Sequence, residues 1–337
     1  GDWEWGYRID LSQNKDGQPE YLTGALYAQH FQAFADSMRQ AASETGKKIL
    51  IGAVTSEAAP QSWQTNTVKT WNSGMMSGIH DKADFYVVHN YFTPYNANSN
   101  AAVILESATT VPSQMIGYVT QALQTNGAAI KPIAMDEWNM FAVGSKQMVS
   151  NTSGVFSVLV LAEALKNKFG MAARWDLLNG WSSGNDMGLF SAGDEPGIAK
   201  WSPRPSFYYM YFFKKFLGDR LVSASTQNST NLKAYASTFS SGEANITMVN
   251  TGATDQLVEI KIKNFRTGSR YYWYSLAGGT DNGEFSAKVF VNGDGPAQGA
   301  GGPADYISLK VNSAPVAGGI IVNVPVRGVI CMVVDRQ

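Results

Sequence analysis

The sequence has few of the residues that metal centres and disulfides require. It contains one cysteine, Cys331, and three histidines among 337 residues. One cysteine excludes an intrachain disulfide and a cysteine-rich metal site, and three histidines argue against a centre built from several of them. Charged residues make up only 16% of the chain, which argues against disorder and long solvated helices. We expect a globular protein with no metal and no cofactor.

The sequence also lacks an excess of either charge and any long hydrophobic run. Its 26 basic and 27 acidic side chains give a net charge of −1. A nucleic-acid-binding surface is basic because it neutralises phosphates, so we expect no nucleic-acid partner. No apolar run approaches the roughly 20 residues that cross a bilayer, and no basic segment precedes an apolar core as in a signal peptide. We therefore expect no membrane span.

Residues 1–218 alternate between helical and strand patterns. A helix is predicted by apolar residues spaced by four and three, which are Tyr27, Phe31, Phe34, Met38 and Ala41. Further helices are predicted at 62–77, 112–126, 150–168 and 205–217. Strands are predicted at 47–54, 84–91, 131–138 and 171–178. Because strands alternate with helices, we predict an α/β domain at 1–218 with a parallel sheet covered by helices.

Residues 219–337 have a different pattern, in which short apolar segments follow one another with turn residues between them. Val258, Ile260 and Ile262 alternate with charged residues, as in a sheet with one face in water. A similar segment at 305–311 is also predicted to be a strand. About nine such segments predict an antiparallel β-sandwich as the second domain, at 219–337.

Residues capable of chemistry follow each of the four predicted parallel strands. Reactive side chains in such sheets lie just beyond the carboxyl ends of the strands. In chain order, the candidates are Glu57, then His89, Asn90 and Tyr91, then Asp136, Glu137, Trp138 and Asn139, and finally Arg174, Trp175, Asp176 and, in the loop beyond, Trp181, Asn185 and Asp186. Strand alternation places Glu137 on one face of its strand and Asp136 on the other.

Each candidate also has a structural interpretation. Glu137 could be neutralised by a neighbouring Lys or Arg, and Glu57 could begin a helix, where a carboxylate is favoured. His89 and Tyr91 are two residues apart on one strand, so their side chains face the same side. They could orient a carboxylate and tune its proton affinity, although a hydrogen-bonded core histidine is the alternative. Trp175 could pack in the core or form the floor under a sugar, since an aromatic face matches the C–H face of a sugar ring. We find no Ser-His-Asp order, P-loop or dinucleotide motif, which leaves carboxylate chemistry.

Three motifs resemble the last strands of clan A glycoside hydrolases, which are retaining enzymes with a (β/α)8 barrel. They are AMDEWNMF around Glu137, VVHNYF around His89 and RWDLLNGW around Trp175. The resemblance is strongest to the family 51 α-L-arabinofuranosidase group, whose domain order is also similar to the helix at 205–217 followed by a sandwich.

The resemblance implies a role for each strand-end residue. Glu137 would be the catalytic nucleophile at the end of strand seven, and His89 and Tyr91 from strand six would hold it ionised. Trp175 from strand eight and Trp181 would form a platform for the sugar. The substrate-binding residues that we expect are His89, Tyr91, Trp138, Asn139, Trp175 and Trp181.

One part of the family pattern is missing from this sequence. The family has an acid/base glutamate in a Gly-Asn-Glu motif at the end of strand four, and no Gly-Asn-Glu occurs here. Residues 1–4 resemble the stretch that follows that motif, and four strand–helix units are predicted where a barrel has eight. We therefore expect the C-terminal half of a (β/α)8 barrel followed by an antiparallel β-sandwich. Its partner would be the missing N-terminal half, on the same precursor or a copurifying chain.

The expected function is a retaining glycoside hydrolase that acts on plant or algal polysaccharide or oligosaccharide and is arabinofuranosidase-like. Alternatives are an agarase-, porphyranase- or xylosidase-like glycosidase of the same clan, or a catalytically inactive carbohydrate-binding protein. The aromatic strand at 271–274 could also make the sandwich a carbohydrate-binding module, although packing against the barrel explains it as well. Such enzymes meet polysaccharide outside the cytoplasm, so we expect a secreted, periplasmic or cell-surface protein.

Overall fold

The computed structural model describes residues 22–94, 97–141, 147–279 and 281–337. The expectation for residues 1–4 lies outside the described residues. Contacts divide the chain into two units, and each is described here by itself. Unit 1 comprises Gly1–Asn90, Val111–Trp138 and Asn167–Ala173, and unit 2 comprises Tyr91–Thr110, Asn139–Lys166 and Arg174–Gln337. The predicted domain division between residues 218 and 219 stays a prediction.

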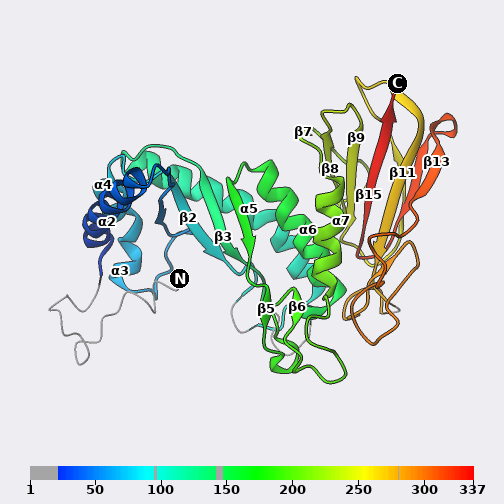
Figure 1. The fold of residues 1–337 in the computed structure, drawn as a ribbon, viewed down its shortest axis with the longest axis horizontal. Coiled ribbons are helices and arrows are strands. Elements are labelled where there is room, and N and C mark those ends of the chain that lie inside the picture. Colours follow the sequence, from blue (N-terminus) through cyan, green and yellow to red (C-terminus); the bar gives the residue numbers. More distant parts are fainter. Residues whose placement is uncertain (1–21, 95–96, 142–146, 280) are drawn as a thin grey trace. The chain divides into compact units, whose positions relative to one another are not determined.

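Unit 1 is built on a four-stranded sheet in which neighbours in the sequence are neighbours in space (Figure 1). The strand order is β1 (Gly52–Val54), β2 (Phe85–Asn90), β3 (Ile133–Trp138) and β4 (Met171–Arg174). β1 pairs with β2, and β2 with β3, in parallel. The predicted parallel sheet is confirmed. Parallel pairing brings the carboxyl ends of these strands to one edge, where the candidate residues lie.

Helices precede or connect these strands, as the alternating pattern predicts. α2 (Gly24–Glu44) precedes β1, α3 (Asn66–Lys69) and α4 (Trp71–Ile79) lie between β1 and β2, and α5 (Ala101–Thr125) lies between β2 and β3. α2 begins where the Thr23 hydroxyl accepts a hydrogen bond of 3.2 Å from the Leu26 amide. Gly24 lets α2 approach α4 closely, because a Cβ there would lie 2.2 Å from the Trp71 carbonyl oxygen. α2 buries Phe31 but leaves Phe34 and Met38 exposed, so the predicted apolar face is only partly covered.

Unit 2 combines two helices with antiparallel sheets. The helices α6 (Asn151–Lys166) and α7 (Pro205–Phe216) pack on one another and on strands of the large sheet. That sheet runs in the order β12 (Phe290–Val291), β11 (Thr267–Ala277), β15 (Gly328–Arg336), β9 (Ala244–Asn250), β8 (Leu232–Thr238) and β7 (Arg220–Val222), with β13 (Asn312–Pro315) also paired to β11. A second sheet pairs β10 (Gln256–Ile260) with β14 (Ile320–Val324).

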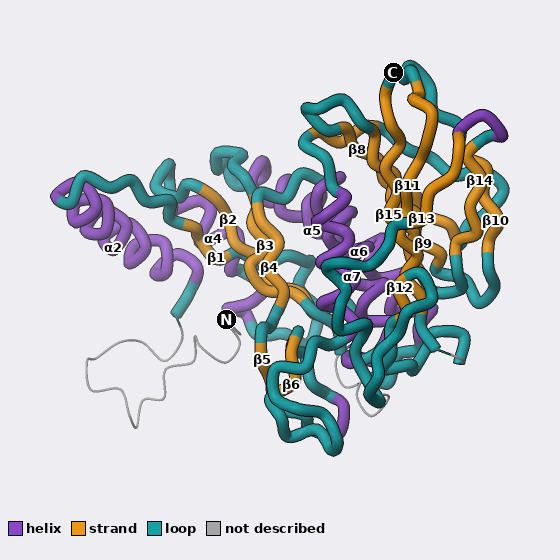
Figure 2. The backbone as a smooth tube through the Cα atoms, turned by 45° about the vertical axis from the view of Figure 1, so that its right-hand side comes forward, coloured by secondary structure: helices purple, strands orange, loops and turns teal. Residues whose placement is uncertain are grey.

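The strands β10 and β14 of the second sheet lie beside the large sheet of unit 2 (Figure 2). The two sheets share a hydrophobic core, as in a β-sandwich: Ile246, Met248 and Met332 of the large sheet pack in one cluster with Ile320 and Val322 of β14. β10 alternates between half-buried and exposed residues, as its sequence predicts. The prediction of a strand at 305–311 is wrong. The chain turns there, with the Ser308 amide donating to the Asp305 carbonyl at 2.8 Å, and β13 begins only at Asn312.

The end of β4 also differs from the predicted strand at 171–178. β4 stops at Arg174, and the two-residue strand β5 (Leu178–Asn179) pairs in parallel with β6 (Phe190–Ser191). The short helices are 3-10 turns at Gln147–Val149, Ser182–Gly184 and Val316–Gly318. Over the described residues, no helix is both long and apolar enough to cross a membrane.

Candidate functional site

The carboxyl ends of β2 and β3 bring His89 together with two carboxylates in unit 1. The register shifts between Val88 and His89, so that Val88 pairs with Met135 but His89 pairs with Glu137. Asp136 is therefore the extra residue of a β-bulge, which interrupts the alternation of side chains. The expectation that Asp136 and Glu137 face opposite ways is wrong, because both approach the same imidazole.

Each nitrogen of the His89 ring faces one carboxylate. Nε2 lies 2.8 Å from Asp136 Oδ1, and Nδ1 lies 3.5 Å from Glu137 Oε2. An imidazole N–H can donate to a carboxylate, so the ring and the two acids orient one another. The Glu137 side chain keeps 20% of its surface exposed, so a ligand can reach it. The arrangement is suited to hold an oriented carboxylate at the edge of the sheet.

Glu57 follows β1 at the same edge and is held by the neighbouring strand. Its Oε1 accepts a hydrogen bond of 3.2 Å from Asn90 Nδ2 at the end of β2. Burial raises the pKa of Glu57, although its backbone amide and Asn90 oppose the shift. The alternative that Glu57 begins a helix is wrong, because α3 begins nine residues later, at Asn66. Its carboxyl group therefore belongs to the strand-end loop.

Trp138 directly follows Glu137 in the sequence and Tyr91 follows His89 by two residues, but the two rings lie in different surroundings. The Trp138 side chain in unit 1 is fully buried. In unit 2, the ring of Tyr91 stacks on Phe141 with centroids 4.9 Å apart, and the Thr93 hydroxyl donates to the Phe141 carbonyl at 2.6 Å. Tyr91 is thus part of an ordered aromatic pair that follows β2. Substrate contact by Trp138 and Tyr91 stays a prediction.

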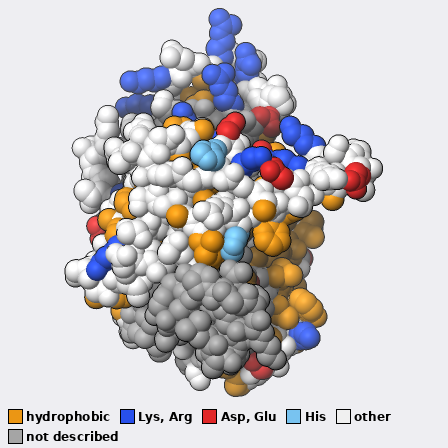
Figure 3. All heavy atoms as spheres, turned by 90° about the vertical axis from the view of Figure 1, so that its left-hand side faces the viewer, with side chains coloured by type: hydrophobic (Ala, Val, Ile, Leu, Met, Phe, Trp, Pro, Cys, Tyr) orange, Lys and Arg blue, Asp and Glu red, His pale blue; other side chains and the backbone are white. Residues whose placement is uncertain are grey.

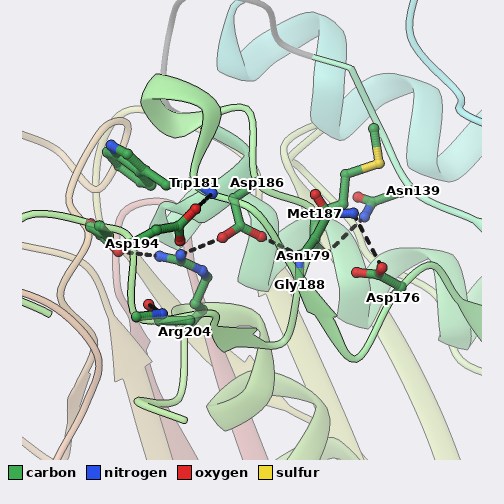
Figure 4. A network of polar contacts seen from close by, with 12 residues as sticks. Asn139, Asp176, Asn179, Trp181, Asp186, Met187, Gly188, Asp194 and Arg204 are labelled. Atoms are coloured by element: carbon green, nitrogen blue, oxygen red, sulfur yellow. Dashed lines mark hydrogen bonds and ion pairs between the residues drawn. The ribbon is translucent and has the colours of Figure 1, made fainter. Parts of the chain in front are cut away.

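Asn139 and Trp175 lie together in unit 2, at the start of the loop that follows β4. The buried Asn139 amide donates to the backbone carbonyl of Trp175 and, at 3.3 Å, to that of Met187. Asn139 and Met187 are labelled in Figure 4. The Trp175–Asp176 peptide bond is cis. Trp175 itself is 44% exposed, so its indole is accessible while its backbone is fixed. Asn139 therefore positions this tryptophan through the main chain.

An ion-pair network organises the rest of that loop and supports Trp181. The Arg204 guanidinium contacts Asp186 Oδ2 at 2.5 Å and Glu195 Oε2 at 2.6 Å, and all three side chains are almost completely buried. Trp181 lies over this guanidinium, 5.6 Å from ring centroid to Cζ, and its amide donates to Asp194 Oδ2 at 2.9 Å. Burial raises the pKa of Asp186, although the Gly188 amide and Arg204 oppose the shift.

The structure brings candidate residues together in both units. In unit 1, His89 contacts Glu137 and also Asp136, which strand alternation had placed on the other face, and Asn90 bonds to Glu57. In unit 2, Asn139 bonds to the backbone of Trp175. The contact between His89 and Asp136 has one signal in the sequence, which is the pair of adjacent acids in the motif DEW. A β-bulge at such a pair can turn the side chain of one acid toward the same neighbour as the other. Among the described residues, no group of three or more His, Cys, Asp or Glu could hold a metal ion.

Comparisons of sequence with known proteins find no relative of this chain. No model of a protein family matches it, and a search of curated proteins returns no match. Solved structures do match. The α-L-arabinofuranosidase from Thermotoga maritima in its arabinose complex superimposes with a TM-score of 0.60 at 16% identity, over 96% of this chain and 65% of that one.

Two further solved structures show the same relation. The GH51 arabinofuranosidase from Xanthomonas axonopodis pv. citri has a TM-score of 0.63 at 13% identity, over 93% of this chain and 63% of that one. CelM2, a bifunctional glucanase-xylanase from a metagenome library, has a TM-score of 0.63 at 13% identity, over 94% of this chain and 60% of that one. The chain thus spans less than two thirds of the length of these proteins, and over that span it shares the fold of these glycoside hydrolases.

Proposed function

We propose that this chain is the nucleophile-bearing part of a retaining glycoside hydrolase. The observation that carries the proposal is the placement of Glu137 at the carboxyl end of a parallel strand, half-buried, with His89 Nδ1 at 3.5 Å from its carboxylate. A nucleophilic carboxylate must be fixed in direction, and a histidine beside it can hold it in place. The shared fold with arabinofuranosidases supports the same assignment.

The proposed reaction is a double displacement at an anomeric carbon. A carboxylic acid protonates the leaving oxygen while Glu137 attacks, and water then releases the sugar with retention of configuration. The two carboxyl groups of such enzymes lie about 5–5.5 Å apart. Trp175 and Trp181 are proposed to form the sugar platform, since both indoles are held by their surroundings and Trp175 is exposed.

The acid/base residue is proposed to come from an N-terminal half of the barrel, on the same precursor or a copurifying chain. Two surfaces of unit 1 support this partner. β1 pairs only with β2 among the described strands, which leaves an open parallel edge. Phe34, Met38 and Leu50 are 70%, 49% and 66% exposed, and hydrophobic side chains lie on the surface of the side that carries α2 (Figure 3). Further strand–helix units would cover both surfaces.

The proposed substrate is an α-L-arabinofuranoside within plant or algal polysaccharide. The solved structures of similar fold include a protein described by its arabinose complex and another described as a glucanase-xylanase. Agarase-, porphyranase- and xylosidase-like action are the proposed alternatives within the clan. An inactive carbohydrate-binding protein is the alternative outside catalysis. Action on polysaccharide also fits the proposed location outside the cytoplasm.

The test is a substitution of Glu137 in the full precursor or the copurified complex. Glu137→Gln keeps the size of the side chain but removes the nucleophile, so we expect kcat on an aryl α-L-arabinofuranoside to fall by about 10³-fold or more. Glu106→Gln, an exposed glutamate on α5, is the matched control and should keep full activity. Added azide should restore turnover of Glu137→Ala with an inverted product. Near-normal turnover by Glu137→Gln would remove it from the role.

A further inference from the structure

The loop between β1 and α3, residues 55–65, carries a tryptophan that the proposed reaction does not use. The Trp63 side chain is 74% exposed, whereas tryptophan ordinarily buries most of its large apolar surface. The loop begins at the carboxyl end of β1, and β1, β2 and β3 are parallel neighbours. It therefore starts from the same edge of unit 1 as His89 and Glu137.

The backbone on both sides of Trp63 is fixed although its indole is in solvent. Before it, the Ser62 carbonyl accepts a hydrogen bond of 2.7 Å from Lys69 Nζ. After it, the Gln64 side chain accepts one of 2.7 Å from the Gln61 amide. A loop held in this way loses little conformational freedom when the indole meets a ligand, so binding there is less costly than to a mobile side chain.

The first residues of the loop, Thr55 and Ser56, are also held by hydrogen bonds. The buried amide of Asn72 on α4 accepts from the Ser56 amide at 2.8 Å and donates to the Ser56 carbonyl at 2.9 Å. The Thr55 hydroxyl also donates to Asn72, at 2.9 Å. These contacts fix the direction in which the chain leaves β1, and with it the starting point of the segment that carries Trp63.

The neighbours of Trp63 indicate the chemistry of its ligand. Gln61, Ser62 and Thr65 are exposed, and Gln64 is half-buried. They are neutral donors and acceptors, and Lys69, a charged side chain that bonds to the segment, contacts a backbone carbonyl. An aromatic face ringed by amides and hydroxyls matches a sugar, which has one apolar C–H face and a rim of hydroxyl groups.

We propose that Trp63 is a stacking platform for a sugar unit of a carbohydrate chain whose cleavage occurs at Glu137; this rests on the function proposed above. Two inter-strand spacings of about 4.8 Å separate β1 from β3, so the loop starts roughly 10 Å from Glu137. Trp63 lies eight residues beyond that start. The platform is therefore assigned to a neighbouring unit of the chain rather than to the sugar at Glu137, so that it favours polymeric over single-sugar substrates.

The test compares Trp63→Ala with Trp201→Ala, an exposed tryptophan of unit 2, in the full precursor or the copurified complex. On arabinan, xylan or agarose, whichever the wild type cleaves, Trp63→Ala should raise KM about tenfold, the effect of losing one aromatic contact. Its kcat/KM on an aryl α-L-arabinofuranoside should stay unchanged, and Trp63→Phe should retain part of the polymer affinity. Equal losses on both substrates, or no loss on the polymer, would overturn the platform.

Binding separates this proposal from the proposed activity. If the wild type hydrolyses neither an aryl glycoside nor a polymer, the proposed activity fails, yet retardation in gels containing arabinan, xylan or agarose still tests Trp63. Retardation that Trp63→Ala loses and Trp201→Ala keeps supports the platform. Retardation that survives in Trp63→Ala, or a wild type that none of the three polymers retards, overturns it.

Discussion

At the scale of single residues, the carboxyl group of Glu57 should make the stability of the protein depend on pH. Burial raises its pKa in the folded protein, against its backbone amide and Asn90, so the folded state holds this proton more tightly than the unfolded chain does. The contribution to stability is complete below the unfolded pKa of about 4.3 and is lost as pH rises through the folded pKa. Glu57→Gln, which cannot ionise, should therefore gain stability relative to the wild type as pH rises.

Urea unfolding between pH 4 and pH 8 would measure this effect. The free energy of unfolding of Glu57→Gln, minus that of the wild type, should increase across the range. The exposed Glu106→Gln serves as the control and should show a constant difference. A constant difference for Glu57→Gln as well would mean that burial does not perturb this carboxyl group.

The sequence predicted which strand ends carry reactive residues but not how their side chains meet. The strand-end rule placed His89 and Glu137 on neighbouring strands, and they are in contact. The same reasoning pointed Asp136 away from Glu137, because alternation assumes a regular strand and a bulge depends on pairing with β2. The bond from Asn90 to Glu57 was equally hidden, since it joins the end of β2 to the loop that follows β1.

At the scale of elements, the loop between β4 and α7 should depend on one buried arginine. Arg204 is the partner of both Asp186 and Glu195, and the three side chains are at most 10% exposed. Removal of the cation leaves two buried carboxylates without compensation, so Arg204→Met should lower the free energy of unfolding by about 3–5 kcal/mol. The same change should loosen Trp181, which lies over the guanidinium.

Chemical unfolding and limited proteolysis would check this prediction together. Protease should cut Arg204→Met between residues 176 and 204 sooner than the wild type. Arg220→Met, an exposed arginine on β7, is the control and should behave like the wild type. Because the cost arises from uncompensated charge, Asp186→Asn in the Arg204→Met background should recover part of the stability. A double variant no more stable than Arg204→Met would contradict that cause.

Element boundaries were predictable where periodicity was strong and wrong where a local signal conflicted with packing. α6 lies within the predicted range at 150–168. α5 begins at Ala101 rather than near residue 112, and Pro112 lies inside it although proline is most common in a first turn. Residues 305–311 have strand-like composition but form a turn, in which Tyr306 packs its ring on Phe207 and Tyr211.

At the scale of the whole molecule, the composition of the layers was predictable and their packing was not. Alternating strands and helices followed by short apolar segments predicted one parallel and further antiparallel sheets, and both kinds are present. The sequence does not show that α6 and α7 pack with the large sheet in a single unit. That packing depends on polar contacts between residues more than 100 positions apart, and the Asn151 amide, which donates to Gly283 and Arg327, provides the clearest case.

Asn151→Ala should therefore destabilise the helices and the sandwich of unit 2 together. Its buried amide donates to the carbonyls of Gly283 at 2.9 Å and Arg327 at 2.8 Å, and its oxygen accepts from the Tyr209 hydroxyl. Loss of these bonds leaves buried polar groups unpaired, at a cost of about 3 kcal/mol. Amide hydrogen exchange should accelerate in α6 and β9 alike, whereas the exposed Asn98→Ala should change neither. Faster exchange in α6 alone would mean that the sandwich unfolds independently of the helices that cover it.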